Sequence, residues 1–244
     1  MDHDIGEAEA RASAVRIGHT ASARSQVEAA FELIRHEILS GALPPRSKLR
    51  FGMLSARYGF GVGTLREALT RLVGEALVTS EEQKGFRVAA ISLADFTDIT
   101  RTRIFLEKEA LRKSILTGDD AWEGRVVAAY HRLAKIETRL ASAAPAPRDE
   151  FEARNRDFHQ ALISACPSPW LTHLHGILFQ QSERYRRIAL ANLTIARDVH
   201  AEHRSIFEAA MARDADRACD YAGEHIERTL IVISELIGFT TPAP

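Results

Sequence analysis

The feature that most constrains how this chain can fold is the stretch from residue 54 to residue 88, where helix, turn, helix and hairpin signals follow one another closely. Gly59, Gly61 and Gly63 interrupt a short first helix and supply the permissive backbone that a turn needs. A second helix is expected from Thr64, because apolar residues recur there at three- and four-residue steps and form one buried stripe. The stripe consists of Leu65, Ala68, Leu69, Leu72, Val73 and Leu77.

A hairpin with a polar tip is expected directly after this second helix. Val78-Thr79 and Phe86-Arg87-Val88 indicate two short strands, and residues 82–85 form the turn between them, with Lys84 at its apex. The order helix, turn, helix and wing is typical of proteins whose second helix enters the major groove of DNA by its amino-terminal end. An ordinary helical hairpin with a solvated charged face is the alternative interpretation.

The distribution of charge supports the DNA-binding interpretation. Residues 44–87 hold eight basic and four acidic side chains, whereas the whole chain has a formal net charge of -1. Because neutralised phosphates supply much of the affinity of a protein for DNA, a locally positive segment on a near-neutral chain suits a DNA-binding domain. The residues expected to contact DNA are Arg46, Arg50, Gly63, Thr64, Arg66, Arg71, Lys84 and Arg87.

The 244 residues are enough for two domains. Residues 1–24 are small, polar and charged with little periodicity, which predicts a mobile arm. Ser25 and Ser92 each begin a capping box, a signal for the start of a helix. We therefore expect a winged helix-turn-helix domain over 25–91 and a second domain over 92–240.

Helical periodicity without a strand pattern runs through the second domain. The expected helices cover about 93–116, 120–142, 149–165, 168–191, 195–212 and 215–238. Short connections between them imply an antiparallel bundle of six or seven helices. The predicted fold class is therefore mainly α, with an N-terminal winged helix-turn-helix followed by this bundle, the candidate effector-binding domain.

Composition argues against a membrane protein. The longest apolar run, Leu230 to Ile233, is far shorter than the ~20 residues that span a bilayer. The first ten residues are acidic and show no export signal, so we expect a cytoplasmic protein. Cys166 and Cys219 are then expected to be reduced thiols.

Three histidines are predicted to lie within helices rather than in loops: His159, His203 and His225. Asn155 precedes His159 by four residues, so the two side chains share one helix face and could bind the same ion. Imidazole nitrogens suit divalent transition metals such as zinc or nickel. Spacing alone leaves open that these are surface groups or satisfied core residues, since the chain has ten histidines. The histidines expected at the surface are His173, His175 and His200.

The DNA-binding stretch carries a family resemblance. Arg66-Glu67-Ala68-Leu69, preceded by Arg57-Tyr58-Gly59 and followed by Glu75-Ala76-Leu77-Val78 and Gly85-Phe86-Arg87-Val88, resembles the signature of the GntR family of bacterial transcription regulators. Most members carry an Arg-Thr-Pro run where this chain has Val62-Gly63-Thr64. The missing arginine contacts guanine in the resembled proteins, so its loss bears on the operator sequence rather than on DNA binding. The glycine-rich form is similar to the subgroup of carbon-starvation-induced, glutarate-responsive repressors.

Residues 92–240 resemble the helical FCD-type effector domain of the FadR branch of that family. Metal-binding members use an Asp-x-x-x-His pair and one histidine from each of two later helices. The resemblance places Asn155, His159, His203 and His225 at these positions. Because an amide oxygen is neutral and a weaker ligand than a carboxylate, the resemblance implies a looser metal site, or one that holds an effector or water.

The resemblance also implies a pocket for a small carboxylate effector, such as a dicarboxylate. Arg103 matches an arginine of the first effector-domain helix, and a buried guanidinium there would bind a carboxylate in bidentate fashion. Arg184 and Tyr185 lie on the inward stripe of the fourth helix and would orient a second polar end. The alternative for these two is an interhelical ion pair with a glutamate of the bundle.

These features predict a homodimeric, ligand-responsive transcription regulator, a repressor, that binds double-stranded operator DNA and senses a small carboxylate, with zinc or nickel as the candidate metal. One alternative is a metal-dependent enzyme built on a helical bundle and fused to a DNA-binding module. The sequence shows no paired carboxylates or nucleophile near the histidines, which weighs against catalysis. Another alternative is an architectural DNA-binding protein, which would not respond to any ligand.

Overall fold

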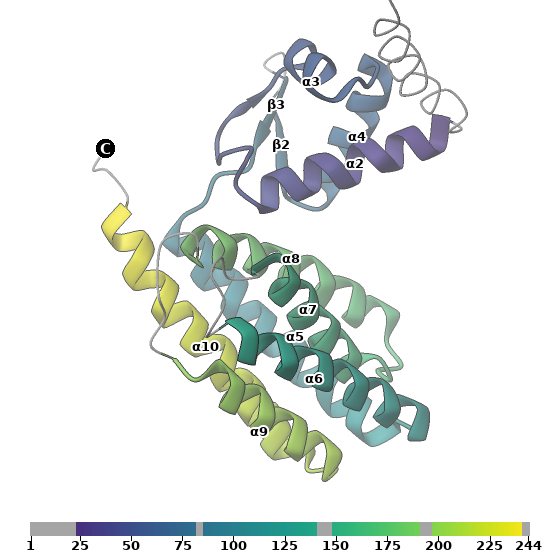
Figure 1. The fold of residues 1–244 in the computed structure, drawn as a ribbon, viewed down its shortest axis with the longest axis vertical. Helices are drawn as coiled ribbons and strands as arrows, with labels where there is room; N and C mark the ends of the chain where they lie inside the picture. The colour runs from purple at the N-terminus through teal and green to yellow at the C-terminus, as the bar shows by residue number, and fades with distance from the viewer. Residues whose placement is uncertain (1–22, 82–84, 141–147, 191–196, 241–244) are drawn as a thin grey trace, which may run out of the picture. The chain divides into compact units, whose positions relative to one another are not determined.

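The computed structural model describes residues 23–81, 85–140, 148–190 and 197–240. The chain divides into two compact units, Met1–Ala90 and Ile91–Pro244 (Figure 1). In its described part, the first unit holds helices and a small sheet, and the second unit is helical. The predicted arm lies outside the described residues except for residues 23 and 24, and the predicted wing tip with Lys84 also lies outside them.

The N-terminal unit has the winged helix-turn-helix order of elements. Its described helices are α2 (Ala23–Leu39), α3 (Phe51–Tyr58) and α4 (Val62–Gly74), and its strands are β1 (Lys48–Leu49), β2 (Val78–Glu81) and β3 (Gly85–Val88). The strands are antiparallel in the order β1-β3-β2, with Val78 opposite Val88 and Lys48 opposite Arg87. β2 and β3 are the predicted hairpin. The sequence did not indicate β1, because two residues carry no periodic signal.

Glycine and apolar spacing produce the two-helix motif. Gly59 has a left-handed φ of 75° and donates its N–H to a carbonyl of α3, which ends that helix. α4 begins at Val62, two residues before the predicted start, so Thr64 lies in its first turn. α2 likewise begins at Ala23, which places Ser25 inside the helix rather than at its cap. The fully buried stripe of α4 is Leu65, Ala68, Leu69 and Leu72.

The second unit is a helical bundle whose helices lie side by side (Figure 1). They are α5 (Leu93–Thr117), α6 (Asp120–Leu140), α7 (Arg148–Ile163), α8 (Pro169–Leu190), α9 (Val199–Met211) and α10 (Ala215–Thr240). The Ser92 hydroxyl accepts a hydrogen bond from the Asp95 N–H, so the predicted capping box does begin α5. α5 packs against α7, α8 and α10, and therefore lies at the centre of the bundle contacts.

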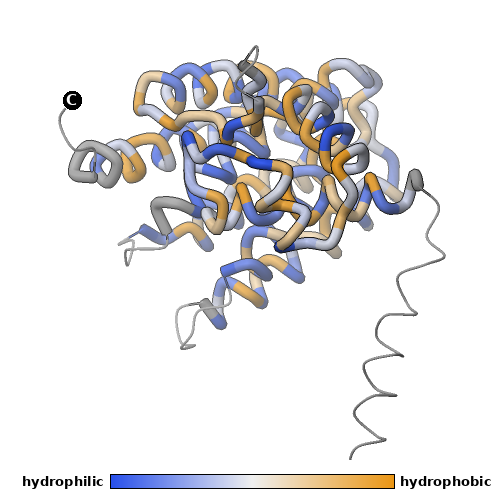
Figure 2. Tube along the Cα trace, turned by 90° about the horizontal axis from the view of Figure 1, so that it is seen from above, coloured by the Kyte–Doolittle hydropathy of each residue, from blue (hydrophilic) through white to orange (hydrophobic). Residues whose placement is uncertain are grey.

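Two apolar cores in the bundle enclose a polar layer. Hydrophobic and hydrophilic residues alternate along the helices, as amphipathic packing requires (Figure 2). The larger core contains Trp122 and Phe158, and the smaller core contains Phe96 stacked on Tyr185, with ring centres 4.5 Å apart. Along α5, buried polar residues lie between the positions that contribute to these two cores. They are Thr100, Arg103 and Glu107. In the described part of the chain, no helix is long and apolar enough to cross a membrane.

Candidate DNA interface and metal centre

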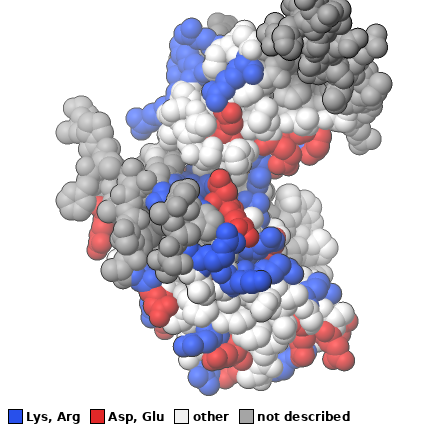
Figure 3. Space-filling view, viewed as in Figure 1, with Lys and Arg blue, Asp and Glu red and all other residues white. Residues whose placement is uncertain are grey.

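The basic surface of the N-terminal unit is open to solvent. Arg46, Arg50 and Arg66 are exposed, as is Gly63 at the start of α4, and Thr64 is partly exposed. Figure 3 shows lysine and arginine side chains gathered on one side of this unit. Basic side chains and the free N–H groups of a helix start are the groups that contact phosphates and base edges. The start of α4 is therefore accessible to DNA.

Two other predicted DNA contacts are engaged within the unit. Arg71 donates to Glu28 of α2 at 2.8 Å, and its guanidinium carbon lies 4.2 Å from the centre of the Phe31 ring. This side chain ties α4 to α2, which favours a packing role over the predicted DNA contact. Arg87 donates to the backbone carbonyl of Arg46 at 3.2 Å and so holds the positively charged segment before β1 against β3.

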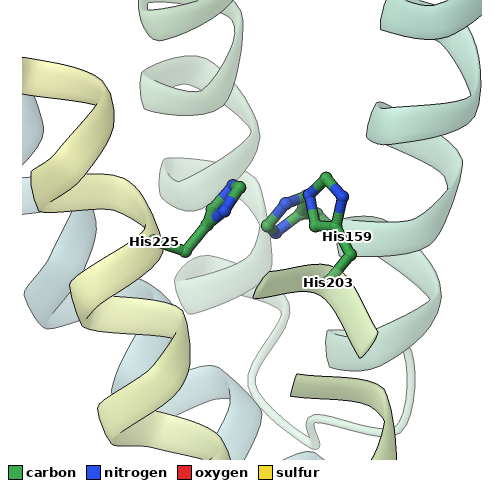
Figure 4. A group of neighbouring side chains, drawn as sticks. All are labelled: His159, His203 and His225. Carbon is green, nitrogen blue, oxygen red and sulfur yellow. The ribbon is translucent and has the colours of Figure 1, made fainter. Parts of the chain in front are cut away.

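The three predicted histidine ligands meet inside the bundle (Figure 4). His159 comes from α7, His203 from α9 and His225 from α10, and one nitrogen of each lies within 4.8 Å of those of the other two. The ring centres of His203 and His225 are 4.5 Å apart. All three are buried. They are close enough to share one divalent ion after a small adjustment of the rings.

A carboxylate lies against the Nδ1 atom of each histidine. The Nδ1 to oxygen distances are 2.6 Å for His159 and Glu107, 2.6 Å for His203 and Glu137, and 2.9 Å for His225 and Glu202. An ionised carboxylate can only accept, so this contact places the imidazole proton on Nδ1 and leaves Nε2 with its lone pair. The Nε2 atoms of His159 and His203 are buried and have no hydrogen-bond partner among the described residues. This is the form in which imidazole binds a metal, so these residues fit the ion that the FCD resemblance implies.

Burial keeps His159 and His225 uncharged near neutral pH. It lowers the pKa of His159 from 6.5 to about 4, although Glu107 acts in the opposite direction. Burial, with His203 nearby, also lowers the pKa of His225 well below its ordinary value. Burial alone would raise the pKa of Glu107, but Arg103 and His159 hold it well below the usual range. Near neutral pH a cation therefore meets neutral imidazoles at His159 and His225 and an ionised carboxylate at Glu107, and it need not displace protons from these two histidines.

Asn155 lies one turn before His159 on α7, as the sequence predicted. It is 4% exposed, and its Oδ1 atom has no hydrogen-bond partner among the described residues. A buried polar atom without a partner costs about 1–3 kcal/mol, so a ligand or water that meets it would stabilise the fold. Asn155 therefore offers a buried, neutral oxygen one turn from His159.

Arg103 is linked to the histidines through Glu107. Its Nε and Nη2 atoms donate to one oxygen of Glu107 at 3.0 and 2.9 Å, and the other oxygen of Glu107 contacts His159. The Arg103 guanidinium also lies 4.4 Å from the centre of the Phe179 ring. A predicted effector residue thus lies next to the predicted metal ligands.

His175 was predicted to be a surface residue, and this prediction is wrong. It is 1% exposed, and its Nε2 atom lies 3.1 Å from Glu107. Phe179, one turn further along α8, packs against both His175 and His159, which turns this face of α8 inward. His200 is partly exposed and contacts Glu137 at 2.8 Å, whereas His173 is exposed as expected.

The structure does not bring Tyr185 to the histidines. Its hydroxyl donates to Asp95 at 2.6 Å and accepts from the backbone N–H of Ser92 at 3.1 Å, at the first turn of α5. Asp95 precedes Arg103 by eight residues, about 12 Å along a helix. Tyr185 therefore secures the start of α5. Arg184 is also buried, and burial lowers its pKa while Tyr185 and Asp95 oppose that shift, so it shares this location.

Several charged side chains near the histidines were not singled out from the sequence. They are Glu107, Glu137, Glu202 and Arg186. Arg186 is buried, donates to Glu152 at 2.8 Å and lies 5.1 Å from the Phe179 ring centre. One signal was available, because charged residues are almost never fully buried unless they are paired. Arg103 and Glu107, four residues apart on the buried face of α5, meet that criterion.

Comparison with known proteins decides the family. Residues 26–88 match the bacterial regulatory proteins of the gntR family, and residues 98–228 match the FCD domain. The chain belongs to the GntR family of regulators with an FCD domain. Members of this family are transcription regulators, so the protein is a DNA-binding regulator with a ligand-sensing domain, and the enzyme alternative is excluded.

Relatives of this GntR-family regulator cover most of its length. It is 44% identical over 215 residues to the HTH-type transcriptional regulator BphR of Paraburkholderia xenovorans, covering 88% of each chain. It is 35% identical over 209 residues to the HTH-type transcriptional repressor GlaR of Escherichia coli, covering 84% of this chain and 94% of that one. The solved structure of E. coli McbR/YncC superposes with a TM-score of 0.73 at 17% identity, over 86% of this chain and 97% of that one, which supports the fold.

Proposed function

We propose that this GntR-family regulator is a homodimeric repressor of the cytoplasm. It would bind two-fold-related operator DNA and release it when the bundle binds a small carboxylate beside a divalent metal, zinc or nickel. One observation above all supports the proposal: three buried histidines from three helices direct nitrogens toward one another in a domain joined to a DNA-binding unit. The name of the relative GlaR, a transcriptional repressor, supports repression rather than activation.

The DNA-binding part of the proposal rests on accessible groups. The exposed start of α4, with Gly63, Thr64 and Arg66, would enter the major groove, and Arg46 and Arg50 would contact phosphates. Half-sites one helical turn apart would then match the two-fold symmetry of a dimer.

The sensing part rests on the polar layer of the bundle. His159, His203, His225 and the Asn155 oxygen would hold the ion, and the bound ion would supply a positive charge that attracts a carboxylate. Arg103 would contribute to the same ligand, since a guanidinium has five N–H donors and two of its nitrogens serve Glu107. A dicarboxylate such as glutarate, the ligand that the subgroup resemblance implies, has two carboxylates, one for the ion and one for Arg103.

Regulation requires that the ligand distinguish two arrangements of the dimer. A carboxylate that bound both arrangements equally would not change operator affinity, however tightly it bound. If the ligand changed the contacts of Glu107 and Arg103, its affinity would differ between the two arrangements of the dimer. Both residues lie on α5, the helix that follows the DNA-binding unit in the chain.

The proposal can be tested with the full chain and an operator selected from random DNA. Metal content is measured by elemental analysis, and operator affinity by fluorescence anisotropy with a panel of mono- and dicarboxylates, with and without zinc. We expect a dicarboxylate to weaken operator binding only in the metal-loaded protein. The double variant His203→Ala with His225→Ala should bind DNA but lose the metal and the response, whereas His173→Ala should retain both.

Two results would contradict the proposal. One is a carboxylate response that persists undiminished in the metal-free double variant. The other is an operator affinity that no carboxylate changes, which would favour an architectural role.

A further inference from the structure

We propose that Glu107, Glu137 and Glu202, here called the carboxylate ring, are positioning residues that orient the three histidines and supply the negative charge that the ligands themselves lack. The inference rests on the proposed function, because it concerns the metal held at the same centre. It goes beyond that function by assigning the affinity of the site to side chains that do not touch the ion.

The geometry of the ring is the first argument. Its three members come from α5, α6 and α9, and each contacts the Nδ1 atom of a different histidine. Their side chains are only 2%, 5% and 10% exposed. Burying an ionised carboxylate costs several kcal/mol unless its partners compensate. Arginines compensate Glu107 and Glu202 in part, so the charge that a cation in the interior would balance lies mainly at Glu137.

The charge of the ligands is the second argument. Asn155 is neutral, so it and three neutral imidazoles would bring no negative charge to a divalent ion. A buried ion without compensating charge is strongly disfavoured. The carboxylate ring lies one side chain behind the histidines, and its hydrogen bonds also make each Nε2 a more basic donor. The ring can therefore replace the carboxylate that is absent at Asn155.

The three members of the ring are not equivalent. Glu107 also pairs with Arg103 at 2.9 Å, and Glu202 pairs with Arg228 at 3.3 Å and with Arg197, so cations partly neutralise both. In the described part of the chain, Glu137 contacts His203 and His200 and forms no ion pair with arginine or lysine. Glu137 should therefore contribute more to metal affinity than either of the others.

The test is a comparison of charge-neutralising variants in the full-length protein. Zinc affinity is measured by competition with a chromophoric chelator, and the absorption spectrum of the cobalt form reports the ligand geometry. Glu137→Gln should weaken zinc binding by about 10- to 100-fold, a range typical of partners behind metal-bound histidines. Glu107→Gln and Glu202→Gln should show smaller losses.

A matched control separates this role from the general cost of removing a buried charge. Glu183 is fully buried and pairs with Arg156 and Arg187. Glu183→Gln should lower the thermal stability but leave zinc affinity and the cobalt spectrum unchanged. Glu137→Asp, which retains the charge, should bind zinc more tightly than Glu137→Gln.

The outcomes distinguish this inference from the proposed function. If the wild-type protein binds no divalent metal, the proposed function fails together with the inference. If the wild type binds zinc but Glu137→Gln binds it equally well, or Glu183→Gln weakens it as much, only the inference is overturned. If Glu137→Gln does not fold, Glu202→Gln replaces it in the test, because Glu202 is more exposed and its position tolerates substitution. A zinc affinity of Glu202→Gln equal to that of Glu183→Gln would then refute the carboxylate ring.

Discussion

Acidification should destabilise the metal-free protein, and His159 should account for a measurable part of the loss. This side chain is 1% exposed, its Nε2 atom has no partner among the described residues, and the rings of Phe158 and Phe179 lie beside it. Burial lowers the pKa of His159 from 6.5 to about 4. Between these values the unfolded chain binds a proton that the folded chain does not, so stability is full above pH 6.5 and falls as the pH drops toward 4.

The size of the effect follows from the two pKa values. A shift from 6.5 to about 4 corresponds to roughly 3 kcal/mol in full, at about 1.4 kcal/mol for each pKa unit. About 2 kcal/mol of this is lost between about pH 7.5 and about pH 5. Glu107 acts in the same direction, because its lowered pKa contributes stability that also disappears on acidification.

The contribution of His159 can be isolated by urea unfolding in the presence of a chelator. We expect the wild type to lose about 2 kcal/mol more than His159→Gln when the pH is lowered from about 7.5 to about 5. His173→Gln, which alters an exposed histidine, should follow the wild type. An equal loss in the wild type and in His159→Gln would refute the argument from burial. Zinc should make the wild-type dependence steeper, since the metal competes with protons for the imidazoles.

Three further predictions concern DNA contacts, metal preference and the start of α5. Arg66→Ala should weaken operator binding and reduce by about one the slope of log affinity against log salt concentration, measured by anisotropy across a salt series. Arg71→Ala should leave that slope unchanged and lower the free energy of unfolding by under about 1 kcal/mol. If instead Arg71→Ala reduces the slope and Arg66→Ala does not, the roles assigned to the two residues are exchanged. Asn155→Asp should tighten manganese binding about tenfold or more, because it adds a charged oxygen ligand. If calorimetry shows no gain in manganese affinity, Asn155 is not a ligand of the ion. Tyr185→Phe should lower the free energy of unfolding by about 1 kcal/mol with an intact carboxylate response, and a lost response would return this residue to the effector site.

Local signals made most of the fold predictable from the sequence. The Ser92 capping box, the left-handed Gly59 and the three- and four-residue spacing of apolar residues act within one or two helical turns, so a single sequence displays them. The bounds of the bundle helices consequently lie within a few residues of those expected. The short strand β1 has no such signal, because its pairing depends on β3, far along the chain.

The candidate metal centre was predictable only in part. The pairing of Asn155 with His159 is a spacing within one helix, and the family resemblance supplied His203 and His225. The contact between His203 and Glu137 joins α9 to α6, and its existence depends on how the two helices are rotated and shifted against each other. Periodicity shows which face of a helix is buried but not what it meets. It therefore placed Tyr185 on the inward face of α8 but did not reveal its contact with Asp95.

The helix α5 has a mechanical consequence for this regulator. It is continuous over 25 residues, carries Glu107 beside the histidines, and starts at Leu93, so only residues 89–92 separate it from β3 of the DNA-binding unit. A rotation or sliding of α5 at Glu107 would also move its first turn, because the helix is continuous between the two. Residues 89–92 are then the segment where this movement would be lost. A few glycines inserted there should leave both ligand binding and DNA binding intact but abolish the effect of the ligand on operator affinity.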